Sequence, residues 1–305
     1  MTSADSHTAI DLDKILAGAQ LPALPQSAIR LLELSKDPNN GPAEFAAPIE
    51  TDPGLTGQVL RFVNSSYFGF SREISSIKLA ITLVGIRTIK NFALWSAVFS
   101  LMPNPKCGPF DLKNLWQDSL RRGIFARVLG KLLGLKDAEG PFAAALLQDL
   151  AVPLLAKELG DRYAEIIENR DGGKKRISEM EREAFGWTHA EAGALIARKW
   201  NLPEEFATLI EYHTELESLL SDPAAEPGKL AVAASSLLPV SGDEAWADQE
   251  TFLKAIAKLV GNNGPSVEEL LAQVDEQFAE FGPILDISEP GKSLVAWYQE
   301  AAAVA

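Results

Sequence analysis

The chain has 305 residues, 47% of them hydrophobic and 23% charged, which is the composition of a folded protein rather than a disordered one. Its 42 acidic and 28 basic side chains give a formal net charge of -14, which repels phosphate backbones, so nucleic acid is not an expected partner. The one cysteine, Cys107, excludes an internal disulfide and a cysteine-rich zinc site, and the reducing cytoplasm is the expected location.

We expect no membrane segment. The first 14 residues have no basic region followed by an apolar stretch, so they do not resemble a secretory signal. The longest uncharged run, residues 91–105, is shorter than the ~20 residues that a membrane-spanning helix needs.

The first clear helix signals lie in the N-terminal half of the chain. Asp52 is a typical N-cap, and Pro53 behind it fits the first helical position, so a helix is predicted to begin there. Asp111 caps a second predicted helix, whose apolar residues follow helical spacing up to Gly134, a typical stop.

Further helices are predicted by capping boxes, in which a hydroxyl residue is followed three positions later by Glu. Thr188 and Glu191 form one such pair, and Ser266 and Glu269 form another. Pro203 predicts one more helix start. No comparable series of strands is present, so we predict an all-α protein, divided by segments rich in proline and glycine at residues 102–111 and 221–229.

A polar pair interrupts the apolar stretch 142–156, which we expect to form one buried helix. Gln148 and Asp149 lie side by side in it, and burial of an unpaired carboxylate costs several kcal/mol, so Asp149 needs a partner. His189 and His213 interrupt two other predicted helices. Two imidazoles and a carboxylate are the groups of a 2-His-1-carboxylate metal site or of general acid-base catalysis.

Structural roles also explain the same three residues, and from the spacing alone we favour them. His189 can satisfy free backbone groups at a helix start, and the helix dipole favours His213 at a helix end. An arginine or backbone amides can hold Asp149. The phosphate-loop, HExxH and GxSxG motifs are absent, and with His7 the sequence has three histidines in all, too few for a histidine-rich metal cluster.

Several separate motifs, taken in order, resemble the HDOD domain, the HD-related output domain of bacterial signalling proteins. They read "LPALPQSAIRLLELSKDPN", "IETDPGLTGQVLRFVNSSYFG", "ISSIKLAITLVGIRTIKNFAL", "LWQDSLRRG", "FAAALLQDLAVPLL" and "GWTHAEAGALIARKWNLPEEFATLIEYH". The resemblance covers residues 14–218 and implies an HD-like helical bundle. It divides into an N-terminal helical lobe at 14–104 and an HD-like lobe at 109–218, followed by a helical extension of unknown role at 223–305.

HDOD domains are similar to HD-superfamily metal phosphohydrolases, including cyclic di-GMP phosphodiesterases, and typically lack a complete set of catalytic residues. In that superfamily a His, a His-Asp pair on the next helix and a later Asp hold the metal. The positions that correspond here are Asp118, Gln148 with Asp149, and Ser235, and the pair of His that often follows is Tyr212 with His213.

These departures from the superfamily pattern remove metal ligands. The amide of Gln148 is a weak ligand for the metals that activate water, and Ser235 stands where the later carboxylate is expected. Asp118 falls opposite the apolar stripe of its helix, beside Arg121 and Arg122, so we expect it to be exposed and salt-bridged.

We therefore expect no metal and no other cofactor. If a metal does bind, its ligands are expected to be Asp149, His189 and His213. In the structural alternative, the Asp149 carboxylate accepts hydrogen bonds from imidazole or backbone donors and ties three helices together.

The resemblance implies a non-catalytic signal-transduction protein that acts through contacts with other signalling proteins. The alternatives are a metal-dependent phosphohydrolase or cyclic-dinucleotide phosphodiesterase with a reduced site, and a protein that binds a nucleotide without turnover. "NSSYFG" at residues 64–69 is the family's most recognisable N-terminal motif, and Asn64 is its candidate residue. Closure of a helix end before an aromatic anchor explains this motif adequately.

Overall fold

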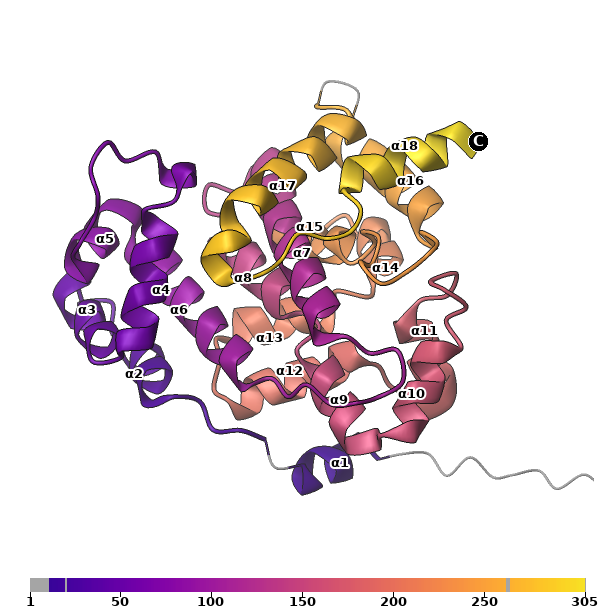
Figure 1. The fold of residues 1–305 in the computed structure, drawn as a ribbon, viewed down its shortest axis with the longest axis horizontal. Coiled ribbons are helices and arrows are strands. Elements are labelled where there is room, and N and C mark those ends of the chain that lie inside the picture. Colours follow the sequence, from indigo (N-terminus) through magenta and orange to yellow (C-terminus); the bar gives the residue numbers. More distant parts are fainter. Residues whose placement is uncertain (1–10, 20, 262–263, 305) are drawn as a thin grey trace, which may run out of the picture.

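The computed structural model describes residues 11–19, 21–261 and 264–304, and every regular element in these ranges is a helix (Figure 1). The prediction of an all-α protein is thereby confirmed. His7 and the first ten of the 14 residues in which a signal sequence was sought lie outside the described residues. Within the described ranges, none of the helices combines the length and the apolar character needed to cross a membrane.

The N-terminal lobe forms one side of the molecule in Figure 1. Its helices are α2 (Gln26–Leu34), α3 (Pro42–Glu50), α4 (Pro53–Val63), α5 (Ile77–Val84) and α6 (Ile86–Leu101), with the short 3-10 helix η1 (Ser66–Phe68) after α4. The predicted cap of α4 is present, because the Asp52 carboxylate accepts a hydrogen bond from the Leu55 amide at 3.0 Å and Pro53 begins the helix.

Helix α1 (Leu12–Gly18) does not belong to that lobe, although the lobe was predicted to begin at residue 14. It packs instead on α12, and the Lys199 ammonium donates to the Leu16 carbonyl at 3.1 Å. The Trp200 indole N–H donates to the Pro22 carbonyl at 3.0 Å, so the segment after α1 is also tied to α12. Lys199 and Trp200 are far in sequence from the α1 segment that they bind, so the order of the motifs did not reveal the packing of α1 on α12.

The second lobe is built around the long helix α7. Its helices are α7 (Leu112–Leu132), α8 (Glu139–Leu147), α9 (Ala151–Leu159), α10 (Asp161–Glu168), α11 (Ile177–Phe185), α12 (His189–Lys199) and α13 (Glu204–Glu211). The predicted cap of α7 is confirmed, since the Asp111 carboxylate accepts from the Lys113 amide at 2.8 Å.

The stretch 142–156 is two helices, and the prediction of one continuous helix is wrong. Residues 148–150 form a turn, in which the Leu150 amide bonds to the Leu147 carbonyl at 3.0 Å and the Val152 amide to the Asp149 carbonyl at 2.9 Å. Pro153 explains the break. It has no N–H to donate to the carbonyl of Asp149 four residues earlier, but it is well suited to the first turn of a new helix.

The C-terminal segment packs into the second lobe and is not a peripheral tail. Its elements are α14 (Leu216–Ser221), α15 (Pro227–Ser235), α16 (Gln249–Val260), α17 (Val267–Phe281), η2 (Pro283–Leu285) and α18 (Leu294–Val304). Helix α15 packs on α7 and α8, and α17 packs on α7. The predicted capping box of α17 is present, with the Ser266 amide 2.7 Å from the Glu269 carboxylate.

A buried guanidinium, that of Arg127 in α7, joins all three parts of the chain. It lies 4.4 Å from the ring centre of Tyr67 in the N-terminal lobe, 4.5 Å from that of Phe142 in α8 and 5.3 Å from that of Phe281 in α17. It also donates to the Gln277 amide oxygen at 2.7 Å. Aromatic faces attract a desolvated cation, so Arg127 stabilises this junction.

Asn64 closes the loop that presents Tyr67 to Arg127. Its amide nitrogen donates to the carbonyls of Leu60 at 2.9 Å and Ile74 at 2.8 Å, and its amide oxygen accepts from the Ile74 amide at 2.7 Å. These three bonds provide the structural explanation of the NSSYFG motif: the Asn fixes both ends of the loop, and the aromatic residue anchors it.

Asn64→Ala removes these bonds, so we expect the free energy of unfolding in urea to fall by about 1–2 kcal/mol. Asn39→Ala is the control, because Asn39 bonds to Asp37 two residues earlier, and it should change stability by less than about 0.5 kcal/mol. An equal loss in the two variants would contradict the proposed role of Asn64.

Candidate functional site

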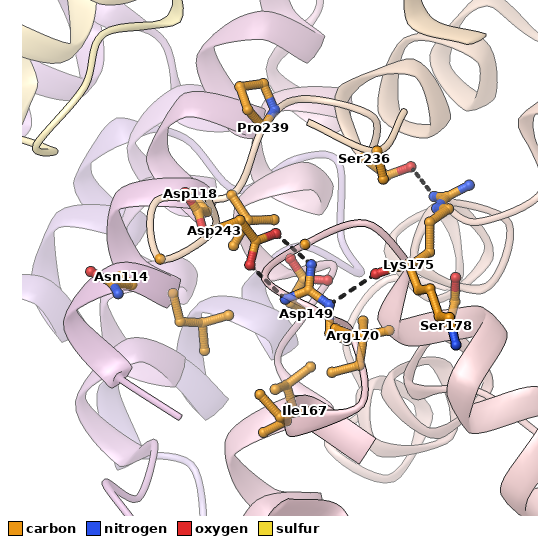
Figure 2. Close-up of a pocket in the computed structure, with 18 of the residues that line it drawn as sticks. Asn114, Asp118, Asp149, Ile167, Arg170, Lys175, Ser178, Ser236, Pro239 and Asp243 are labelled. Carbon is orange, nitrogen blue, oxygen red and sulfur yellow. Dashed lines mark hydrogen bonds and ion pairs between the residues drawn. The ribbon is translucent and has the colours of Figure 1, made fainter. Parts of the chain in front are cut away.

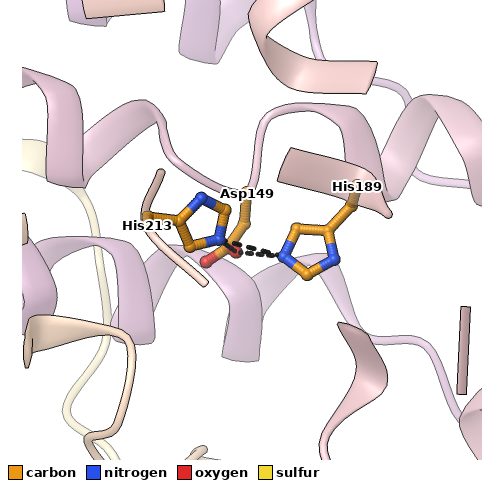
Figure 3. A group of neighbouring side chains, drawn as sticks. All are labelled: Asp149, His189 and His213. Carbon is orange, nitrogen blue, oxygen red and sulfur yellow. Dashed lines mark hydrogen bonds and ion pairs between the residues drawn. The ribbon is translucent and has the colours of Figure 1, made fainter. Parts of the chain in front are cut away.

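The candidate site is centred on the buried carboxylate of Asp149, in the turn between α8 and α9 (Figure 3). One oxygen, Oδ1, lies 3.3 Å from Nε2 of His189 and 3.5 Å from Nε2 of His213. The two Nε2 atoms are 3.1 Å apart. The structure therefore brings together the three residues that the sequence singled out.

Each imidazole is placed by a local feature of the chain. The Thr188 amide bonds to the Glu191 carboxylate at 2.7 Å, which completes the predicted capping box and makes His189 the first residue of α12. His213 lies in the turn after α13, and its Nδ1 is 2.6 Å from the Ile210 carbonyl. Since a carbonyl only accepts, Nδ1 of His213 carries the proton and its Nε2 presents a lone pair.

Glu181 in α11 orients the imidazole of His189. Its fully buried carboxylate accepts from the His189 backbone amide at 2.8 Å and from Nδ1 of the His189 ring at 2.6 Å. The buried Tyr163 hydroxyl donates to the other oxygen of Glu181. Glu181 was not predicted as a site residue, although its spacing of four from both Ile177 and Phe185 places it on the apolar face of α11.

The second oxygen of Asp149 is bound by a residue that was also missed. The guanidinium of Arg122 donates to Oδ2 of Asp149, and both side chains are buried. The spacing of Asp118 and Arg122, four residues apart, places both on one face of α7. The spacing does not show that this face is buried, because counting along the helix places it opposite the apolar stripe.

Asp118 is buried, and the prediction of an exposed, salt-bridged residue is wrong. Its Oδ1 accepts from the Ser241 amide at 2.9 Å and from the Ser241 hydroxyl at 2.6 Å. The connection between α15 and α16 covers this face of α7, and a segment so distant in sequence cannot be placed by counting residues along one helix.

The other candidate positions lie beside the cluster or away from it. Gln148 is fully buried, with its amide oxygen 3.2 Å from the Ser235 hydroxyl at the end of α15. Among the described residues, its amide nitrogen has no hydrogen-bond partner. Tyr212 is 44% exposed and lies outside the cluster, with its ring centre 5.5 Å from the Lys229 ammonium.

The charges of the cluster shift the pKa values of its members in opposite directions. Burial opposes ionisation of Asp149, but Arg122 and the His189 ring outweigh it and hold the pKa of Asp149 well below its usual value. Burial likewise lowers the pKa of His189, but Glu181 and Asp149 outweigh it and raise the value to about 9. Burial dominates for His213 and lowers its pKa. At neutral pH, His189 is therefore an imidazolium and His213 is neutral.

The cluster opens onto a cavity of about 360 Å³, a volume at the lower end of the range for small-ligand sites (Figure 2). Asp149, His189 and His213 line it, together with Asp118 and Arg122. The connection between α15 and α16 also lines it, so the C-terminal segment completes the site.

The donor set fits one metal ion. One oxygen of Asp149 and one nitrogen each of His189 and His213 lie within 4.8 Å of one another. Both Nδ1 atoms face acceptors, the arrangement that orients histidine ligands at metal sites. A second metal does not fit, because Gln148 and Ser235 offer neutral oxygens that bond to each other.

The pH dependence of folding follows from His189. Its pKa is about 9 in the folded chain against 6.5 in the unfolded one, so its stabilising contribution is complete below pH 6.5 and is lost as the pH rises through 9. We expect the free energy of unfolding to fall by roughly 3 kcal/mol over this interval. Urea denaturation at several pH values measures it.

His189→Gln should remove most of that slope. His213→Gln is the matched control and should retain it, because the pKa of His213 is lowered and this group does not titrate in the interval. The same slope in wild type and His189→Gln would show that another group is responsible.

Known proteins resemble this chain in sequence and in fold. A curated protein of Treponema pallidum, named only as uncharacterized, is 26% identical over 212 residues. That alignment covers 64% of this chain but 38% of the relative, so the chain spans well under half of the relative's length.

Solved structures share the fold at lower sequence identity. An HDOD domain protein of unknown function from Geobacter sulfurreducens is 22% identical, with a TM-score of 0.67 over 90% of this chain and 96% of that one. A candidate phosphohydrolase from Shewanella amazonensis is also 22% identical, with a TM-score of 0.64 over 92% and 98%. A candidate signal transduction protein from Marinobacter aquaeolei is 19% identical, with a TM-score of 0.61 over 94% and 65%.

A sequence profile decides the family. The profile of the HDOD domain matches residues 21–216, which is more than half of the chain and includes Asp149, His189 and His213. The chain belongs to the HDOD domain family.

Proposed function

We propose that this protein is a signal-transduction protein that acts through protein contacts and has no catalytic step of its own. The observation that carries the proposal is the neutralisation of Asp149 by the chain itself. Arg122 binds one carboxylate oxygen, and the His189 imidazolium lies 3.3 Å from the other. A buried carboxylate is stable only with such compensation, and here it needs no metal ion.

The two positions beside Asp149 support the same proposal. In a metal phosphohydrolase of the HD type they would hold ligands, but Gln148 and Ser235 bond to each other across the interface between α8 and α15. This contact stabilises the packing of two helices, as expected of a core that has kept its architecture without its metal. Contacts with other signalling proteins in the bacterial cytoplasm are the mode of action that we propose.

A second function, metal-dependent hydrolysis of a phosphoester, is favoured by one observation. The Nε2 atoms of His189 and His213 converge on Oδ1 of Asp149, with both Nδ1 atoms held by acceptors. These three residues would hold one ion, and such an ion would lower the pKa of a bound water. The protein from Shewanella amazonensis described as a candidate phosphohydrolase has the same fold.

Metal analysis of the purified protein, combined with hydrolysis of bis(p-nitrophenyl) phosphate, separates the two functions. We expect less than stoichiometric iron, manganese and zinc, and no hydrolysis above background. Stoichiometric metal together with hydrolysis that Asp149→Ala abolishes would overturn the non-catalytic proposal.

Asp149→Ala should also destabilise the fold, because it leaves the buried Arg122 without its carboxylate. We expect a loss of about 3–5 kcal/mol in urea denaturation. Asp13→Ala, in the first turn of α1, is the exposed control and should change stability by less than about 0.5 kcal/mol. A small loss in Asp149→Ala would show that the ion pair does not hold the core together.

Restoring ligands should restore metal binding if Gln148 and Ser235 are altered ligand positions. We expect the double variant Gln148→His with Ser235→Asp to bind Mn²⁺ at least about tenfold more tightly than wild type. Isothermal titration calorimetry measures the affinity, with the two single variants as controls and circular dichroism to verify folding. Unchanged affinity in a folded double variant would contradict this assignment of the two positions.

A further inference from the structure

The connection between α15 and α16, residues 236–248, contributes many of the residues that line the cavity, and we call it the strap. A connection of this length without regular structure is uncommon in a packed domain and is often functional. Its first anchor is Ser241, which donates twice to the buried Asp118. Its second anchor is the carbonyl of Gly172, which accepts from the amides of Glu244 at 2.9 Å and Ala245 at 3.1 Å.

The third anchor is an ion pair at the edge of the cavity (Figure 2). Both terminal nitrogens of Arg170 donate to Asp243 of the strap, at 3.0 and 2.5 Å, and the two side chains are mostly buried. The loop after α10 permits this approach. Gly173 has a φ of 95°, and a Cβ there would lie 2.4 Å from Asp243.

A second guanidinium of the cavity is also bound by the strap. Arg176 donates to the Ser236 hydroxyl at 3.0 Å, and its Nε lies 3.4 Å from a carboxylate oxygen of Asp248. The strap thus directs one carboxylate at each of two arginines that face the cavity.

The strap decides the balance of charge in the cavity. The permanently cationic groups of the lining are Arg122, Arg170, Lys175 and Arg176, and they are matched in number by the acids outside the strap, which are Asp111, Asp118, Asp149 and Glu168. Asp243 and Asp248 add two negative charges. The cavity therefore has an excess of negative charge with the strap in place, and these charges balance without the two strap carboxylates.

We propose that Asp243 and Asp248 occupy an oxyanion-binding site, and that a small phosphate-bearing molecule displaces them and releases the strap. The bidentate geometry of Arg170 with Asp243 is the geometry in which a guanidinium binds two phosphate oxygens. A phosphate dianion brings more charge and more acceptors than one carboxylate, so it competes for the same arginines.

Release of the strap would directly affect the positions of the two helices that it connects, α15 and α16. The strap is continuous with α15, which packs on α7 and α8, and with α16 on its other side. The inference rests on the proposed signalling role and supplies its input: an anion in the cavity changes the surface that α15 and α16 present to a partner.

Hydrogen-deuterium exchange of the wild-type protein tests the inference without any substitution. We expect saturating inorganic phosphate to increase exchange in residues 236–248, whereas a ligand that merely covered the strap would decrease it. Sodium chloride at equal ionic strength is the control. Adenosine monophosphate in a parallel arm distinguishes a nucleotide from free phosphate, since tighter binding of the nucleotide than of phosphate identifies the larger ligand.

Variants test the competition. Asp243→Asn removes the competing charge, so phosphate affinity in calorimetry should rise at least about tenfold, and Arg170→Gln should weaken it by a similar factor. Asp171→Asn is the control: Asp171 follows Arg170 in the loop after α10, is exposed and does not line the cavity. It should leave the affinity unchanged. Ser241→Ala loosens the strap with every arginine retained, so it should raise the affinity if Asp243→Asn does not fold.

Equal phosphate affinity in Asp243→Asn and Asp171→Asn would overturn the inference. So would wild-type binding that leaves exchange in residues 236–248 unchanged or decreased, and so would the absence of binding in both wild type and Ser241→Ala. These results would contradict only the inference about the strap. The proposed non-catalytic function would instead be contradicted by metal-dependent hydrolysis.

Discussion

The carboxylate of Asp149 is buried with a negative charge, so the surrounding chain must supply positive charge and hydrogen bonds to it. Arg122 reaches it from α7, and His189 and His213 reach it from α12 and the turn after α13. Four separate segments of the second lobe are therefore held by one group. Removing Arg122 or His189 leaves uncompensated charge in the core, so the contributions of these two groups to stability are coupled.

Local features of the chain place the Asp149 carboxylate and its partners. Pro153 ends the hydrogen-bond ladder at Asp149, so α8 stops and the turn directs the side chain between α7 and α12. The capping box at Thr188 similarly begins α12 at His189 and points its ring inward. Glu181 and the Ile210 carbonyl then fix which ring nitrogen faces the centre.

Local signals predicted the helical fold and three members of the site, because caps, prolines and apolar spacing are properties of neighbouring residues. The prediction of exposure for Asp118 was wrong because its partner, Ser241, is 123 positions away. The continuous helix over 142–156 was wrong because its apolar pattern outweighed Pro153 in our interpretation. Arg122 was missed for a related reason: a charged residue next to Arg121 looked like a solvated face, whereas both arginines are buried.

Asp149, His189 and His213 can form either a metal site or an internal ion-pair network, and the protonation state of His189 determines which is favoured. A metal needs neutral imidazoles, but His189 carries a proton with a pKa of about 9. At pH 7, metal binding must therefore expel that proton, at a cost of roughly 3 kcal/mol, and must also share Asp149 with Arg122, which stays charged. Both costs favour the cluster as an internal ion-pair network at neutral pH. A rise in pH removes the first cost and leaves the second, so Arg122 is the group that most strongly separates this core from a metal centre.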